Sequence, residues 1–193
     1  MQMAIPLFDE AKPYEQIPFQ YSLHIEQSPC GETIHKGYLG RKLDCRREIA
    51  ESLCRDIPLD VTSMAYNMAF EKAVLSRLAL LYPDLADHLL NIRDHMVDLL
   101  VPFKAGDYYR AAMGGSNSIK AVLPACCPND PDLDYHALPV VHNGAEAMEI
   151  YPHLVEASGE EQEKIYAGLW AYCGLDTLAM VKVLDRLYLD SQD

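Results

Sequence analysis

The sequence predicts an α/β fold in which a mixed sheet is covered by helices, and three observations predict it. Strand-like patterns lie in the first third of the chain, helical patterns dominate the remainder, and no segment is repeated. The chain has 193 residues, of which 50% are hydrophobic, so it can bury one substantial core. We therefore expect a single domain that spans residues 1–193.

The strands are predicted from alternation of apolar and polar side chains. The clearest case lies between Ile17 and Glu26, where every second residue is apolar. A Ser-Pro-Cys-Gly turn follows, and Glu32 to Leu39 can return as the second strand of a hairpin. Ser63 to Asn67 predicts a short buried strand.

The helices are predicted from apolar residues three and four positions apart. In the helix that begins at Phe70, the expected buried face contains Phe70, Val74, Leu78 and Leu81. The segment from Cys127 to Pro139 is rich in Pro, Asp and Asn, and we expect it to be the most flexible part of the chain. The predicted helices are Asp44–Asp56, Phe70–Leu81, Leu85–Leu100, Ser116–Leu123 with Pro124 ending it, Asn143–Glu156 and Gly159–Leu189.

Charge and cysteine content limit the class of protein. A formal net charge of −13 argues against a nucleic-acid binder with a broad basic face. It does not exclude a nuclease, because catalytic metal ions carry the positive charge that meets the phosphate. The six cysteines lack a paired Cys-x-x-Cys spacing, which favours reduced thiols. A zinc site drawn from Cys126, Cys127, His136 and His142 is the weaker alternative.

No secretory leader and no apolar run close to the roughly 20 residues of a membrane span is apparent in the sequence. We therefore expect a soluble, cytoplasmic protein without a membrane partner.

Two separated sites contain residues suited to phosphodiester chemistry. Tyr172 and Asp176 are four residues apart, so a helix places both on one face. In a two-metal phosphodiesterase such a carboxylate binds an ion and such a phenol orients the attacking water. Glu71, at the start of the predicted helix, could be another oxygen ligand. The spacing alone is weak, because Tyr172 could be a core aromatic, and Asp176 and Glu71 ordinary helix carboxylates.

The run from Ser116 to Lys120 offers a possible substrate-binding element. Ser116, Ser118 and Lys120 could hold a phosphate at a helix start, with Lys120 one turn into the helix. The alternative is structural, with Ser116 as the N-cap of a helix that packs through apolar residues. The spacing is not that of a Walker loop, which favours the structural interpretation.

Five blocks of sequence, in order along nearly the whole chain, resemble a bacterial domain family of unknown function, number 2779. In that family the domain typically follows a RecB-like nuclease-related region of a longer protein. The blocks are Phe19-Gln-Tyr-Ser-Leu-His24, Ala65-Tyr-Asn-Met-Ala-Phe-Glu71, Val97-Asp-Leu-Leu-Val-Pro-Phe-Lys104, Gly115-Ser-Asn-Ser-Ile-Lys-Ala-Val-Leu-Pro124 and Tyr172-Cys-Gly-Leu-Asp-Thr-Leu-Ala-Met180.

The resemblance implies a ribonuclease H-like fold of the DEDD 3′-to-5′ exonuclease type that uses Mg²⁺ or Mn²⁺. Asn67 and Glu71 then match the second exonuclease motif, and Tyr172 and Asp176 match the third in its tyrosine variant. Asp98 falls in a recurrent block, as a metal ligand or as a helix cap. Nucleic acid, DNA or RNA, and the RecB-like region of the parent protein are the implied partners.

The first exonuclease motif is absent from the sequence. Family members carry an Asp-Phe-Glu-Thr-like strand before the segment that matches Ala4 to Phe8. Asp9 and Glu10 cannot replace it, because adjacent residues of a strand face opposite sides. We therefore expect a truncated domain that lacks its first central strand and has little or no activity.

The missing strand has a structural consequence and leaves a second function open. It would leave the strand from Phe19 to Glu26 with an unpaired edge, which favours a homodimer that repairs the sheet. The alternative function is a non-catalytic scaffold or protein-interaction module attached to a nuclease. A small-molecule hydrolase that uses the same carboxylates has no distinctive support.

Overall fold

The computed structural model describes residues 8–9, 11–128, 130 and 133–192, and these form a mixed α/β structure. The described strands are β1 (Gln20–Glu26), β2 (Thr33–Leu39), β3 (Ser63–Ala65) and β4 (Met96–Asp98). The described α-helices are α1 (Arg46–Asp56), α2 (Ala69–Leu81), α3 (Ala86–Asp94), α4 (Val101–Ala105), α5 (Ile119–Cys126), α6 (Gly144–Glu156) and α7 (Gly159–Asp190). Short 3-10 turns occupy Ala111–Met113 and Tyr135–Ala137.

The strands form two separate sheets. β1 and β2 make an antiparallel hairpin in which Gln20 is opposite Leu39 and Glu26 is opposite Thr33. β3 and β4 make a parallel pair of three residues each. Within the described residues no strand joins β1 to β3. The prediction of α/β architecture is therefore confirmed, but its strands do not form one continuous sheet.

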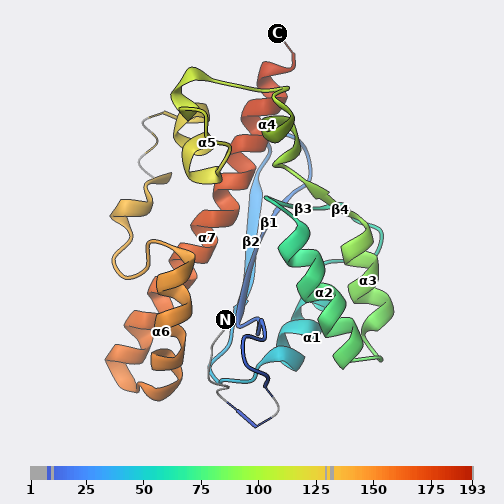
Figure 1. Cartoon of the computed structure of the whole chain (residues 1–193), viewed down its shortest axis with the longest axis vertical. Coiled ribbons are helices and arrows are strands. Elements are labelled where there is room, and N and C mark those ends of the chain that lie inside the picture. Colours follow the sequence, from blue (N-terminus) through green and yellow to red (C-terminus); the bar gives the residue numbers. More distant parts are fainter. Residues whose placement is uncertain (1–7, 10, 129, 131–132, 193) are drawn as a thin grey trace.

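Helices cover both faces of the β1–β2 hairpin. On one face Gln20 Nε2 donates a hydrogen bond to the Leu169 carbonyl of α7, at 2.8 Å. On the other face the Tyr21 hydroxyl donates to the Asp56 carboxylate at the end of α1, at 2.7 Å. Figure 1 shows the hairpin between α7 on one side and α1, α2 and α3 on the other. The alternating side chains predicted for β1 therefore face two helical layers, one on each side of the hairpin.

Two buried clusters make up the core, and α7 contributes to both. The first lies around the hairpin, α1, α3 and α6, and includes the fully buried Leu89, Tyr151 and Leu169. The second lies around α4 and α5 and includes Val122 and Val183. The first cluster is built from segments far apart in sequence, since Tyr151 stacks on Phe19 with ring centroids 4.2 Å apart.

Gly40 packs closely against two side chains of the first cluster, Cys45 and Tyr151. A Cβ at this position would lie 2.4 Å from Cys45 Sγ and 2.7 Å from the Tyr151 hydroxyl. Both neighbours are buried, and the Tyr151 hydroxyl donates to the Lys42 carbonyl at 2.6 Å. Neither neighbour can therefore move aside without loss of packing.

We expect Gly40→Ala to lower the free energy of unfolding by about 1 to 2 kcal/mol, because overpacking a close contact displaces both neighbours. Urea unfolding monitored by circular dichroism measures the change. Gly144→Ala, at the exposed start of α6, is the matched control, because an added Cβ there would meet only the Tyr172 hydroxyl, at 3.9 Å. A Gly40→Ala protein as stable as the wild type would contradict the packing described for this site.

The segment predicted as a single helix from Leu85 to Leu100 is the main error in the predicted elements. α3 ends at Asp94, and Met96 to Asp98 instead form β4 beside β3. A new helix, α4, then begins at Val101. The Asp98 carboxylate accepts the Leu100 backbone N–H at 2.9 Å, which starts α4 in a new direction. Tertiary pairing with β3 therefore overrides the helical propensity of this segment.

Two further expectations about helices are wrong. Phe70 and Leu81 are 52% and 46% exposed, whereas α2 buries Leu75, Leu78 and Ala79. This shift occurs because α2 packs along α3 and leaves its first turn beside the space between the sheets. Pro124 does not end α5, which continues to Cys126; the bond from the Cys127 N–H to the Leu123 carbonyl closes its last turn.

By length and composition alone, α7 meets the criterion for a helix that could cross a membrane. Its most apolar 18-residue window has a mean hydropathy of 1.2, and 28% of that window is buried. Core helices of soluble proteins meet the same criterion. Because Leu169, Ala179 and Val183 of α7 are fully buried in the two clusters, we assign α7 to the core.

Candidate functional site

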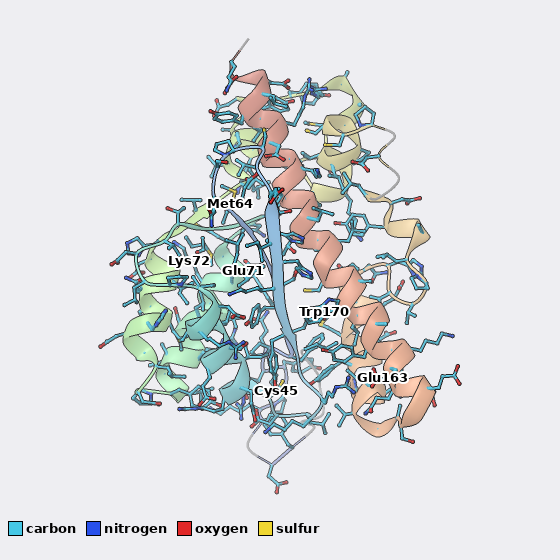
Figure 2. The ribbon with its side chains drawn as sticks, turned by 180° about the vertical axis from the view of Figure 1, so that it is seen from behind. Cys45, Met64, Glu71, Lys72, Glu163 and Trp170 are labelled. Atoms are coloured by element: carbon cyan, nitrogen blue, oxygen red, sulfur yellow. The ribbon has the colours of Figure 1, made fainter. Side chains whose placement is uncertain are left out.

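A groove of about 520 Å³ lies between the two sheets and contains four of the predicted site residues. Its walls come from β1, β3, the first turn of α2 and the middle of α7. Glu71, Tyr172 and Asp176 line it, and Lys120 of α5 joins them. Figure 2 shows Met64 of β3 and Glu71 of α2 on one side of the hairpin, and Trp170 of α7 on the other.

Asp176 is held by two tyrosines on the α7 side of the groove. The Tyr135 hydroxyl donates to Asp176 Oδ1 at 2.8 Å, and Tyr172 also hydrogen-bonds to this carboxyl. Burial raises the pKa of Asp176, and the two tyrosine hydrogen bonds and the charge of Lys120 oppose that increase. Burial likewise raises the pKa of Tyr172, and the neighbouring Asp176 raises it further. Tyr172 is therefore a neutral hydrogen-bond donor at pH 7.

Glu71 lies on the α2 side of the groove with one carboxylate oxygen unsatisfied. It occupies the first turn of α2, where the helix dipole favours a negative charge. Its Oε2 atom is buried and has no hydrogen-bond partner among the residues that the structure describes. Burial raises the pKa of Glu71, and the charge of Asp98 adds to the increase. Such a group favours a proton, a cation or a hydrogen-bond donor from another molecule.

The two carboxyl groups do not by themselves make a metal site. Burial and different neighbours shift the two pKa values, and neither carboxyl contributes to the shift of the other. Across the described ranges, no three His, Cys, Asp or Glu side chains come together in a way that could hold a metal ion. Mg²⁺ and Mn²⁺ need several oxygen ligands. The residues described here therefore provide an incomplete set for such an ion.

Asp98 has a structural position outside the groove. Its carboxylate accepts the backbone N–H groups of Asn67 at 2.8 Å, Met68 at 3.3 Å and Leu100 at 2.9 Å. Asn67 has a left-handed backbone, with φ of 67°, and an exposed side chain. Asp98 thus joins the turn after β3 to the end of β4, and neither residue lines the groove.

The predicted phosphate-binding run is only partly at the groove. Lys120 lines it, but Lys120 Nζ donates to the His142 carbonyl at 3.1 Å and lies 5.2 Å from the Tyr135 ring centroid. Ser116 and Ser118 are exposed and hydrogen-bond to each other. Ser118, rather than Ser116, occupies the N-cap of α5, so the expected cap position is wrong by two residues.

Reasoning from the sequence missed two groups beside the groove. Tyr135 lies in the segment expected to be most flexible, and the sequence gave no signal that it reaches Asp176. A polar cluster also joins β1 to α7, in which Thr177 Oγ1 lies 2.7 Å from Ser22 Oγ and 2.8 Å from His24 Nδ1. Alternation on β1 placed Ser22 and His24 on one face, and only the fold shows that Thr177 meets them.

The cysteines are all free thiols in the structure. Cys126 is buried in the second cluster, and Cys127 Sγ lies 3.7 Å from the Lys182 carbonyl. The side chain of His136 lies outside the described part of the chain. The alternative of a zinc site therefore gains no support from the described groups.

Residues 1–118 match a protein family described as "Domain of unknown function (DUF2779)". This match covers more than half of the chain, so the chain belongs to that family. No curated protein and no solved structure matches it.

Proposed function

We propose that this chain, as a member of the DUF2779 family, supplies part of a phosphodiester-hydrolysing site of the ribonuclease H-like exonuclease type. The observation that supports the proposal is the presence of Glu71, Tyr172 and Asp176 in one groove. Glu71 and Asp176 are distant in sequence and are the oxygen ligands that a divalent ion prefers. Lys120 adds a positive charge suited to a phosphate at the same groove.

Each residue has a distinct role in this proposal. Asp176 and Glu71 would each give carboxylate oxygen ligands to Mg²⁺ or Mn²⁺, and a bound ion would stabilise charge on the phosphate. Tyr172, neutral and hydrogen-bonded to Asp176, would orient a water molecule. Because the described carboxylates are too few, further acidic residues from a segment such as the Asp-Phe-Glu-Thr-like strand are needed.

We expect Mn²⁺-dependent digestion of 3′-labelled single-stranded DNA or RNA only when the chain is extended upstream by that strand. Asp176→Asn and Glu71→Gln in the extended protein should lower the rate by about 100-fold or more, since each removes a charge that stabilises the transition state. Asp94→Asn is the matched control, because Asp94 is an exposed acid that pairs with Arg93.

Thermal unfolding provides a second measurement that does not depend on activity. Mn²⁺ should raise the Tm of the extended protein, and Asp176→Asn should remove that increase. If the extended protein neither cuts nucleic acid nor responds to Mn²⁺, the nuclease proposal is wrong.

The second candidate function is a non-catalytic interaction module that holds the RecB-like region of a parent protein or another partner. Two observations favour it: the set of carboxylates is incomplete, and β1 has only one strand partner within the described residues. A nuclease needs the carboxylates charged and metal-bound, whereas an interaction module needs only the groove. The Mn²⁺ measurements separate these two functions.

A further inference from the structure

On the edge of β1 that faces the groove, the backbone groups have no strand partner among the described strands. The Gly40 N–H donates to the Phe19 carbonyl at 2.9 Å, and these two residues are opposite each other in the hairpin register. Because hydrogen-bonded pairs alternate in an antiparallel ladder, Tyr21 and Leu23 direct their backbone groups toward β2. The backbone N–H and C=O groups of Ser22 and those of the other even-numbered residues therefore point away from β2. Gln20 to Leu23 line the groove, so this edge is open to it.

The other side of the groove is also strand-like. Ser63, Met64 and Ala65 of β3 line it, and β3 pairs on its far side with β4. A parallel pair of three residues is too short to be a stable sheet alone. One added strand between β1 and β3 would pair with both edges and join the four strands into one sheet of five.

The two walls of the groove differ in chemistry. The wall from α1, α2 and α3 is mainly apolar, with Ile49, Leu53, Leu75 and Ile92 among its side chains, and Glu71 of α2 is the charged group among its described lining. The α7 wall is mixed and presents hydroxyl and carboxyl groups. Since side chains alternate along a strand, an occupant with apolar residues at every second position and polar residues between them matches both walls.

Charge complementarity indicates which polar residues the occupant carries. The charged side chains among the groove's described lining are Glu71, Lys120 and Asp176, and Lys120 already donates to His142. Glu71 Oε2 is buried, and no described residue hydrogen-bonds to it. When no metal ion is bound, an acidic occupant adds repulsion in a chain with a net charge of −13, whereas a lysine or arginine supplies both a donor and an opposite charge.

The groove suits a single extended segment better than a second folded copy. Strands flank it on two sides, and α2 and α7 contribute to its walls, so a hairpin edge with its own helices cannot enter. Addition of an extended strand to an open sheet edge is an established mode of peptide recognition. The backbone supplies affinity and the alternating side chains supply specificity.

We propose that the groove between β1 and β3 binds an extended segment of a partner protein that alternates apolar residues with polar ones and carries a basic side chain that reaches Asp176 on the α7 side or Glu71 on the α2 side. This inference goes beyond the proposed hydrolysis, because it requires neither a metal ion nor cleavage. It assigns a partner chemistry to the carboxyl groups of the groove, and it predicts that β1 gains a second strand neighbour.

The test uses a fluorescent seven-residue peptide that alternates valine with lysine and threonine, matching the seven residues of β1. We expect fluorescence anisotropy to show saturable binding in EDTA. Replacement of lysine by aspartate in the peptide should weaken binding by about tenfold or more, the scale of one charge-assisted hydrogen bond. A peptide with proline at its central position should bind weakly as well, because proline lacks the N–H that pairs with the edge.

Hydrogen exchange followed by NMR tests where the peptide binds. The amides of Ser22 and His24 should become protected by the peptide, whereas those of Tyr21 and Leu23, already bonded to β2, should change little. Ser22→Pro should abolish binding, and Ser22→Ala, which keeps the backbone N–H, should retain it. The double variant Glu71→Gln/Asp176→Asn should lose the preference for the lysine peptide over the aspartate peptide, which tests the charge argument if Ser22→Pro fails to fold.

Three results would overturn the proposal. They are the absence of peptide-induced protection at Ser22 and His24, equal binding of the lysine and aspartate peptides in EDTA, and a homodimer that protects these amides without peptide. A protein that binds the peptide but never cuts nucleic acid contradicts only the proposed hydrolysis. A protein that cuts in the extended form but never binds the peptide contradicts only this inference.

Discussion

Replacement of Asp98 by alanine is expected to lower the free energy of unfolding by about 3 to 4 kcal/mol. The Asp98 carboxylate accepts three backbone N–H groups, from Asn67, Met68 and Leu100. Hydrogen bonds to a charged group contribute about 1.5 to 3 kcal/mol each, and water can satisfy some of the donors that alanine releases. The estimate is therefore below the sum of three such bonds.

The location of these bonds increases the expected effect. They hold the left-handed turn at Asn67, which connects β3 to α2, against the residue that starts α4. Loss of the carboxylate releases the turns that follow β3 and β4, at the carboxyl-terminal end of the parallel pair. Guanidinium unfolding monitored by circular dichroism and by tyrosine fluorescence measures the effect, and the two probes should agree if unfolding stays two-state.

Asp98→Asn is the informative comparison. The amide keeps one acceptor oxygen and loses the charge, so we expect a loss of about half that of alanine. Asp94→Ala, on the exposed end of α3, should change stability by less than about 0.5 kcal/mol. If Asp98→Ala is as stable as the wild type but lowers the response to Mn²⁺, Asp98 is a metal ligand rather than a structural acceptor.

Glu71→Met is expected to have the opposite effect and to raise the free energy of unfolding by roughly 2 kcal/mol at pH 7. Glu71 Oε2 is buried without a hydrogen-bond partner in the described part of the chain, and an unsatisfied buried polar atom costs about 1 to 3 kcal/mol. Methionine has a similar length and adapts to irregular space, so it removes the polar group without leaving a large cavity. A stabilising substitution in the groove would indicate that Glu71 is retained for function rather than for folding.

The pH dependence of this effect has a defined sign. Burial raises the pKa of Glu71 above its ordinary value of 4.5, so the folded protein holds this proton more tightly than the unfolded chain. Below pH 4.5 the carboxyl is neutral in both states and the wild type pays little penalty. As the pH rises through the raised pKa, the wild type loses stability that Glu71→Met keeps. The advantage of the variant should therefore grow from pH 4 to pH 7.

Urea unfolding of both proteins at several pH values measures this difference. Glu149→Met, at an exposed position of α6, is the matched control and should show no such dependence. An advantage that is independent of pH would show that the pKa of Glu71 is the same in the folded and unfolded states, and would contradict the effect of burial described for this carboxyl. If Mn²⁺ restores the wild type to the stability of the variant, a metal ion satisfies the carboxylate.

The sequence predicted the local elements better than their pairing. Alternation identified the hairpin, and the long periodic segment after Gly159 predicted α7 to within one residue of its end. The sequence did not predict β4, because a strand of three residues is too short to show alternation of apolar and polar side chains. Its pairing with Ser63 to Ala65 is also a tertiary contact. Burial of α2 was also misassigned, since its neighbours decide which face is covered.

For the candidate site, too, the sequence predicted local features better than tertiary contacts. The spacing of Tyr172 and Asp176 predicted that they share one helix face, and the position of Glu71 at a helix start suggested a further ligand; all three line the groove. The sequence could not show that Tyr135 donates to Asp176 across 41 positions. Whether Asp98 caps or ligates was left open, because a carboxylate after a strand looks the same in both roles. Only its three backbone donors distinguish a structural role.

The length of α7 has a consequence for how the protein responds to force and to heat. At about 1.5 Å per residue, its 32 residues form a rod of about 48 Å, with Leu169 set in one core and Val183 in the other. Unfolding of either cluster would therefore remove the packing of one end of α7. The two halves should therefore unfold in a single thermal transition. A spectroscopic probe near Val183 should report the loss of stability that a substitution around Leu169 causes.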